Sequence, residues 1–454
     1  HTRVTARLAL RTAEVEVAQT FVNKRDVPIE ALYVFPRPEN AAVHRMSMKL
    51  GSRTIEGKIE RRSVARDAYA SAKAAGQPAA LLEERRGNVF TFSIANVAPR
   101  QTIDVNVRYV QDLSSDAGVY EFVFPMVVGP RFDPERAKVG PTSDAEPISP
   151  PYVGKGQRTG ADIAIEVIAE ASLVGGAVEV VTHETKLRRD DAGLLRVELA
   201  KHDRIPNRDF VLRYRVAREV PRAILVPSGE DGYFTLVVEP PPIDAADSAP
   251  REVVFVIDVS GSMAGAPLSA AKRSIALSLE RLGPHDTFNV ISFSGATDKL
   301  FFAPRPVNAN NLAEALAFVD RMSAGGGTMM LDAIAAALGP EVPADRERHV
   351  LFMTDGFVSI EDELVAATRT FTEASKKSGG RGRVFALGLG PSPNRALLEG
   401  ITREGGGVAT YASGRDGPAR AVNAFFRYID RSILRDVSID WGGAAVVDVT
   451  RSEE

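Results

Sequence analysis

The feature that most constrains the fold of this chain is a regular alternation of strand-like and helix-like segments over residues 250–430. An apolar run at residues 253–257 predicts a buried strand, and the segment PLSAAKRSIALSLERL after it predicts a helix with a proline in its first turn. The segments TFNVISF, RHVLFMTD and RVFALGLG predict further strands, with helical periodicity between and after them. Such alternation indicates a mostly parallel sheet with helices on both faces, a doubly wound, Rossmann-like α/β domain.

The rest of the chain has the apolar–polar alternation of β-strands. Residues 1–132 contain the segments TARLALRTAEVEVAQTFVN, VFTFSIANV and TIDVNVRYV, and they predict an all-β domain with one helix that ends near Gly76. Residues 133–160 are rich in proline, glycine and serine and predict a linker or a long loop. Short strand patterns over 161–249 predict a β-sandwich of its own. Residues 431–454 return to a β pattern that we expect to pair with this sandwich.

Composition limits the classes of partner and site. A formal net charge of −3 gives no electrostatic reason to expect a nucleic-acid partner. The absence of cysteine excludes disulfides, thiolate metal sites and cysteine nucleophiles. No apolar stretch approaches the ~20 residues of a membrane span. The chain opens on His1 rather than on methionine, so we expect it to be a piece of a longer precursor.

Oxygen-bearing side chains follow the strands of the α/β region at three places. FVIDVSGSM carries Asp258, Ser260 and Ser262, AGGGTMMLD carries Thr328, and FMTDG carries Asp355. Ligands of open α/β sheets bind beyond the carboxyl ends of the strands, and alternate side chains of an extended loop point the same way. Hydroxyls and carboxylates suit Mg²⁺, with Ca²⁺ or Mn²⁺ as alternatives. Each segment alone is consistent with a turn or a helix cap, but the three together predict a divalent-cation site with one position open to an anionic oxygen.

Enzymatic interpretations of the same residues agree less well with the sequence. Aspartate-based phosphotransfer needs a second carboxylate two residues after Asp258, where Ser260 stands. Ser262 lacks the Gly-x-Ser-x-Gly pattern of a nucleophile elbow, and none of the three segments contains a histidine. An acid in the first loop would repel the phosphates of a dinucleotide. We therefore expect a binding protein and not an enzyme.

The three segments resemble the metal-ion-dependent adhesion site, or MIDAS, of von Willebrand factor type A domains. The resemblance covers about 250–430. It implies that Ser260, Ser262 and Thr328 bind Mg²⁺ directly or nearly so, and that Asp258 and Asp355 bind it directly or through water. It also implies that a Glu or Asp of a protein partner completes the coordination.

The N-terminal segments VAQTFVNKRDVPIEALYVFPRPENAAV and FTFSIANVAPRQTIDVNVRYVQDL resemble the vault protein inter-alpha-trypsin (VIT) domain, with Pro99-Arg100 where Pro-Gly is expected. A VIT domain before a type A domain is similar to the layout of inter-alpha-trypsin inhibitor heavy chains and of bacterial surface or secreted proteins, in which a hybrid-like β region flanks the type A domain. The resemblance implies a metal-dependent adhesion protein that is secreted, periplasmic or on the cell surface. The alternative is a structural or assembly scaffold, in or outside the cell, whose metal only stabilises the fold.

Overall fold

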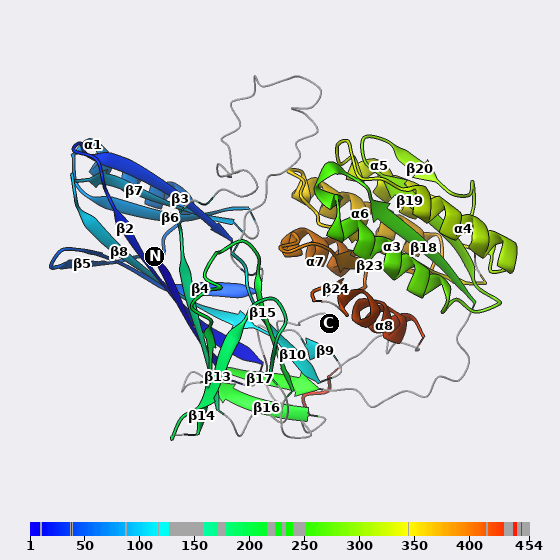
Figure 1. Ribbon diagram of the computed structural model, residues 1–454, viewed down its shortest axis with the longest axis horizontal. Coiled ribbons are helices and arrows are strands. Elements are labelled where there is room, and N and C mark those ends of the chain that lie inside the picture. The colour runs from blue at the N-terminus through cyan, green and yellow to red at the C-terminus, as the bar shows by residue number, and fades with distance from the viewer. Residues whose placement is uncertain are drawn as a thin grey trace. The chain divides into compact units, whose positions relative to one another are not determined.

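The computed structural model describes residues 1–126, 160–170, 178–215, 223–228, 233–238 and 250–430, apart from 10, 37, 39, 87–88, 114, 117, 192, 344 and 415, together with 158, 439–442 and 446. The chain forms two compact units (Figure 1). The first contains the described residues up to 238, and the second contains those from 250 onward.

The largest sheet of the first unit has eight strands in the order β13-β14-β11-β1-β2-β8-β4-β5. They are β1 (Thr2–Ala9), β2 (Thr12–Val22), β4 (Ala41–Leu50), β5 (Arg53–Glu56), β8 (Thr102–Asp112), β11 (Ile163–Glu170), β13 (Thr185–Arg189) and β14 (Leu194–Leu199). Neighbouring strands are antiparallel except β1 and β11, which run parallel with Thr2 opposite Ile163. Alternate residues of β2 are buried, as its sequence pattern predicts.

Two smaller sheets pack on this large sheet. One has the order β12-β15-β10-β9 and the other β3-β7-β6. Their strands are β3 (Ile29–Pro36), β6 (Ala79–Arg86), β7 (Val89–Val97), β9 (Ser115–Asp116), β10 (Val119–Phe124), β12 (Glu179–Val180) and β15 (Phe210–Arg215). One core joins β1, β2, β11 and β14 with β10 and β15, and a second joins β4 and β8 with β7. The unit also contains the helix α1 (Arg62–Ala74) and a hairpin of β16 (Ala223–Ser228) and β17 (Tyr233–Val238).

The strands after residue 160 do not form the separate sandwich that the sequence pattern suggests. β11 extends the sheet of β1, and β15 pairs with β10, so both ranges share two sheets and one core. Apolar alternation predicts which face of a strand is buried but not which strand lies beside it. The domain limits in residue numbers stay a prediction. The expected linker at 133–160 and the returning β segment at 431–454 lie almost entirely outside the described residues.

The second unit is built on a mostly parallel sheet in the order β20-β19-β18-β22-β23-β24. The parallel strands are β18 (Arg251–Asp258), β19 (Thr287–Phe293), β22 (Glu347–Thr354), β23 (Gly382–Gly388) and β24 (Ala409–Tyr411). The short strands β20 (Thr297–Lys299) and β21 (Arg305–Pro306) both pair antiparallel with β19.

Helices cover both faces of this sheet, so the predicted doubly wound α/β fold is confirmed (Figure 1). One face packs against α3 (Ala266–Leu279), α4 (Ala309–Arg321) and α8 (Gly417–Ile429), and the other against α5 (Met330–Leu338), α6 (Glu361–Lys377) and α7 (Arg395–Glu404). Along β18, Val253 and Phe255 enter the first layer, whereas Val254 and Val256 enter the second. Every residue of β18 is buried, as is typical of a central parallel strand.

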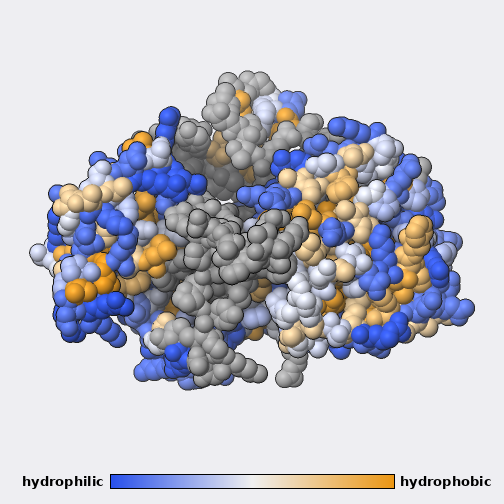
Figure 2. Space-filling view, turned by 90° about the horizontal axis from the view of Figure 1, so that it is seen from above, coloured by the Kyte–Doolittle hydropathy of each residue, from blue (hydrophilic) through white to orange (hydrophobic). Residues whose placement is uncertain are grey.

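Hydrophobic residues lie scattered among hydrophilic ones over the visible coloured surface (Figure 2). The large exposed apolar side chains include Ile59 in the first unit and Phe302 in the second. Single residues of this kind are ordinary on protein surfaces. None of the described helices combines the length and the apolar character needed to span a bilayer.

Candidate metal site

Asp258 is the last residue of β18, and the buried strand carries its carboxylate to the carboxyl edge of the sheet. Its Oδ1 accepts a hydrogen bond from the Ser260 N–H (2.8 Å), and its Oδ2 accepts one from the Thr354 hydroxyl (2.6 Å). A short 3₁₀ turn, η1 (Gly261–Met263), follows, and the buried Met263 side chain anchors it. The loop is therefore held on both sides before α3 begins.

A continuous chain of hydrogen bonds joins this loop to the end of β22. The hydroxyl oxygens of Ser260 and Ser262 lie 3.2 Å apart, and Ser262 hydrogen-bonds the Asp355 carboxylate. The Phe357 N–H donates to Asp355 Oδ1 (3.2 Å). Ser262 is exposed, whereas Asp258, Ser260 and Asp355 are buried, so the network has one side open to solvent.

Thr328 is brought to the same edge by backbone contacts of its glycine loop. The Gly261 N–H donates to Gly326 O (3.3 Å), and the Gly325 N–H donates to Val259 O (2.8 Å). Gly326 has φ +81°, a conformation that favours glycine, which explains why the loop is glycine-rich. Thr328 is buried. Within the described residues, no hydrogen bond links its hydroxyl to the other four predicted ligands.

Electrostatics favour a cation here. Burial raises the pKa of the Asp258 carboxyl, and the hydrogen bonds from Ser260 and Thr354 oppose that shift. Burial raises the pKa of Asp355 to about 6; the bond from Ser262 opposes this, and the Asp258 charge adds to it. No lysine, arginine or histidine of the described chain forms an ion pair with either carboxylate. Two neighbouring buried carboxylates beside hydroxyl oxygens fit an exogenous hard divalent cation.

The described residues contain no group of three or more His, Cys, Asp or Glu side chains that could hold a metal. The candidate set is not a group of that kind, because it has only two carboxylates and its other members are hydroxyls. The structure thus places four of the predicted residues in one network and the loop of the fifth against it. Metal binding by these residues stays a prediction.

Two models of known families match the chain. The vault protein inter-alpha-trypsin domain matches residues 1–109, and the von Willebrand factor type A domain matches residues 251–411. The chain is a VIT and von Willebrand factor type A domain protein. The predicted VIT domain and type A domain are thereby confirmed, and the second match covers all three segments of the candidate site.

The relatives of this VIT and type A domain protein are distant. It is 27% identical to human "Protein mono-ADP-ribosyltransferase PARP4", with 96% of this chain and 25% of that protein aligned. It is 25% identical to bovine "Inter-alpha-trypsin inhibitor heavy chain H4", with 99% of this chain and 48% of that protein aligned. The chain therefore spans a quarter to a half of these relatives. Among solved structures, manganese-loaded Plasmodium vivax TRAP protein is similar over 40% of this chain and 74% of that one, with 16% identity and a TM-score of 0.30.

Two further residues support the site, and the sequence did not single them out. The fully buried Thr354 binds Asp258 from inside the sheet. Asn394 precedes α7, where its side chain accepts a hydrogen bond from the Leu397 N–H, and its own N–H donates to Asp355 O (2.8 Å). Asparagine is one of the preferred residues at the N-cap position, directly before the first turn of a helix. Nothing in the pattern connects that cap with Asp355.

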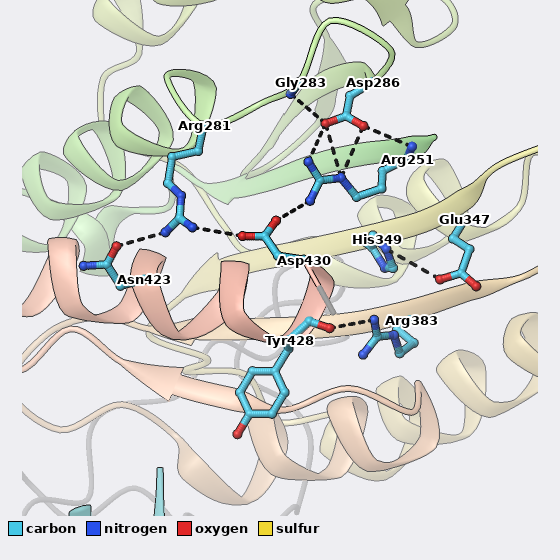
Figure 3. Close-up of polar contacts among 10 residues, drawn as sticks. All are labelled: Arg251, Arg281, Gly283, Asp286, Glu347, His349, Arg383, Asn423, Tyr428 and Asp430. Atoms are coloured by element: carbon cyan, nitrogen blue, oxygen red, sulfur yellow. Dashed lines mark hydrogen bonds and ion pairs between the residues drawn. The ribbon is translucent and has the colours of Figure 1, made fainter. Parts of the chain in front are cut away.

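The opposite edge of the type A sheet carries a second polar cluster, in which arginines are paired with aspartates (Figure 3). The Arg251 guanidinium lies between the carboxylates of Asp286 and Asp430, and Arg281 also donates to Asp430 (3.0 Å). His349 lies beside this cluster, in β22, far from the strand end that carries Asp355. These ion pairs join the starts of two strands to the end of α8. The role of this cluster is therefore structural.

Proposed function

We propose that the type A domain binds a divalent cation, Mg²⁺ in the first place, and through it an acidic residue of a protein partner. The observation that carries this proposal is the hydrogen-bonded chain from Thr354 through Asp258, Ser260 and Ser262 to Asp355. Its two buried carboxylates form no ion pair with a cationic side chain of the described residues. When bound, the cation would supply a positive charge that attracts a carboxylate from outside the chain.

The candidate residues differ in which of their oxygen atoms are available to a cation. Both oxygens of Asp258 already accept hydrogen bonds from the chain, which favours contact with the ion through water. Ser260, Ser262 and Thr328 offer hydroxyl oxygens, whose lone pairs suit a hard cation. The exposed Ser262 lies on the side from which a partner would approach.

The rim around the site has almost no charge of its own. The loops after β18, β19, β22 and β23 and the glycine loop before α5 contain one charged residue, Asp355; they are residues 259–266, 294–297, 355–360, 389–393 and 323–329. The loop after the edge strand β24 is the charged one, with Arg415 and Asp416 in its sequence. The cation would therefore dominate the local field, and small residues such as Ala264 and Gly265 would let a partner backbone come close. This favours a carboxylate in a neutral sequence context as the partner group.

Asp258→Ala tests the proposal. The variant should lose metal affinity by more than the ~10–100-fold typical of changes to supporting residues. Isothermal titration of the full chain with Mg²⁺ and with Mn²⁺ measures the affinity, and circular dichroism checks that the variant is folded. Asp362→Ala, an exposed aspartate in the first turn of α6, is the control. Unchanged metal affinity of Asp258→Ala would refute the assignment.

A structural role of the metal is the second candidate, because the site residues tie together three separate loops of the domain. Capture of a protein from native extract in Mg²⁺, lost both in EDTA and in Asp258→Ala, would support adhesion. A metal-dependent melting temperature without metal-dependent capture would support the scaffold.

We also propose that the chain acts by binding and not by catalysis, and that it acts outside the cytoplasm. The first point is supported by the absence of histidine from the rim segments, where general acid–base catalysis would most often use one. The second rests on the resemblance to inter-alpha-trypsin inhibitor heavy chains, to one of which the chain is 25% identical. Fractionation of the producing cells, followed by immunodetection of the chain, tests the location.

A further inference from the structure

We infer that Thr354 is a positioning residue of the metal site, because its buried hydroxyl fixes both the Asp258 carboxylate and the turn that carries Asp355. The inference rests on the proposed function, which it deepens by naming the group that sets the arrangement of the two acids. Thr354 would touch neither the cation nor the partner.

Only one assignment of donor and acceptor is consistent for the two hydrogen bonds of the Thr354 hydroxyl. A carboxylate accepts and an amide N–H donates, so the hydroxyl proton goes to Asp258 Oδ2 (2.6 Å) and an oxygen lone pair accepts from the Gly356 N–H (2.8 Å). Thr354 is fully buried, so no water replaces either partner. The hydroxyl thus links the two acidic segments of the site from inside the sheet.

The parallel register of the sheet puts Thr354 in this place. Ile257 of β18 stands opposite Met353 of β22, so Asp258 and Thr354 are the next residues along their strands. A strand residue points to the face opposite to its neighbours, which separates the direction of Thr354 from that of Asp355. Asp355 can therefore face the site while Thr354 supports Asp258 from behind.

A second contact holds the same turn from the other side. The Asn394 N–H donates to Asp355 O (2.8 Å), and its Nδ2 donates to Gly356 O (3.0 Å). Gly356 has φ +71°, and a Cβ there would come within 3.1 Å of the Asn394 side chain. The turn is therefore fixed to α7 by Asn394, and Thr354 is the side chain that fixes it to Asp258.

Loss of the hydroxyl would change the site in two ways. Asp258 Oδ2 would lose its inner donor, so the carboxylate would be free to rotate toward the serine hydroxyls. The Gly356 amide would lose its acceptor in a buried position, which loosens the turn that carries Asp355. Both changes alter the relative position of the two acids without removing either of them.

Thr354→Val, which replaces the hydroxyl by a methyl group, tests the inference by titration of the full chain with Mn²⁺ and with Mg²⁺. We expect roughly 10–100-fold weaker binding, the range typical of residues that orient metal ligands. Thr354→Ser keeps the hydroxyl and should restore the affinity. Thr368→Val is the matched control, because Thr368 is also buried but donates to Leu364 O within α6.

Hydrogen exchange in EDTA gives a readout that needs no metal. The amides of Ser260 and Gly356 should exchange faster in Thr354→Val, and as in the wild type in Thr354→Ser and Thr368→Val. A wild-type chain that binds neither cation would overturn the proposed function. Wild-type affinity in Thr354→Val, or unchanged exchange at both amides, would overturn the role of Thr354 alone.

Discussion

At the scale of single residues, His349 is a buried base that the fold holds neutral. Burial lowers its pKa well below the usual value, and the positive charges of Arg383 and Arg251 lower it further. The facing acid is Glu347, whose carboxylate is 3.9 Å from His349 Nε2, and the Phe385 ring packs against the imidazole edge. The folded chain therefore does not take up the proton that the unfolded chain binds near its ordinary pKa.

This pKa shift predicts a loss of stability in acid. Above pH ~6.5 His349 is neutral in both the folded and the unfolded state and does not affect the free energy of unfolding. Below that pH the unfolded state binds a proton that the folded state does not, which favours unfolding. Between pH 7.5 and 5.5, His349 should lower the unfolding free energy of the second unit by about 1.4 kcal/mol. His349→Leu should reduce the pH dependence by that amount, as measured by hydrogen exchange of β18 and β22 amides. An equal pH dependence in both proteins would contradict the assignment.

The candidate site shows what sequence can and cannot predict about single residues. Asp258, Ser260, Ser262 and Asp355 could be found because oxygen side chains after buried strands meet at one edge of a parallel sheet. Thr354 could not, because a residue inside an apolar strand is expected to pack and its hydrogen-bond partners come from register. Arg100 illustrates a similar limit: it stands where the glycine of Pro-Gly was expected, and it adopts φ +60°.

At the scale of elements, the buried Arg251 attaches the end of α8 to the starts of two strands through ion pairs (Figure 3). Arg251 opens β18, and its guanidinium donates to Asp286 just before β19 (2.7 Å) and to Asp430 just after α8. The Arg281 guanidinium lies 4.3 Å from the centroid of the Phe426 ring. Removing one member of such a group leaves an uncompensated buried charge, which is more costly than losing a surface pair.

Arg251→Met should therefore lower the unfolding free energy of the second unit by about 3–5 kcal/mol. The control is Arg369→Met, which removes the exposed pair with Glu404 between α6 and α7 and should cost at most about 1 kcal/mol. Urea denaturation followed by circular dichroism at helix wavelengths measures both. Equal losses in the two variants would show that the buried cluster is no more important than a surface contact.

Helices were easier to predict than strand partners. The helical periodicity expected between and after the strands of 250–430 corresponds to helices such as α6 (EDELVAATRTFTEASKK) and α8 (GPARAVNAFFRYI), since periodicity and end signals are local. By contrast, the pairing of β11 with β1 joins segments about 160 residues apart. Local pattern carries no information on such a partner. The helix α1 was also predicted, but it contains no buried residue, because an amphipathic pattern does not say how much of a face is covered.

At the scale of the whole molecule, the two units give the metal proposal an internal control. All five candidate ligands belong to the second unit, and the described part of the first unit contains no group of acidic, histidine or cysteine side chains able to hold a metal. A ligand that binds only the folded state of one unit stabilises that unit and no other unless the two are coupled. Mg²⁺ should therefore slow the hydrogen exchange of amides in the second unit and leave that of amides in the first unit unchanged.

With Mg²⁺ at a hundred times its dissociation constant, the unfolding free energy of the second unit should rise by about 2.7 kcal/mol. Hydrogen exchange of β18 and β22 amides, with and without EDTA, measures this gain, and the β2 and β8 amides of the first unit serve as the reference. Asp258→Asn, which keeps a hydrogen-bond acceptor for the Thr354 hydroxyl, should remove the gain because it removes a negative charge from the site. Equal stabilisation of both units, or a gain that survives in Asp258→Asn, would mean that Mg²⁺ acts elsewhere on the chain.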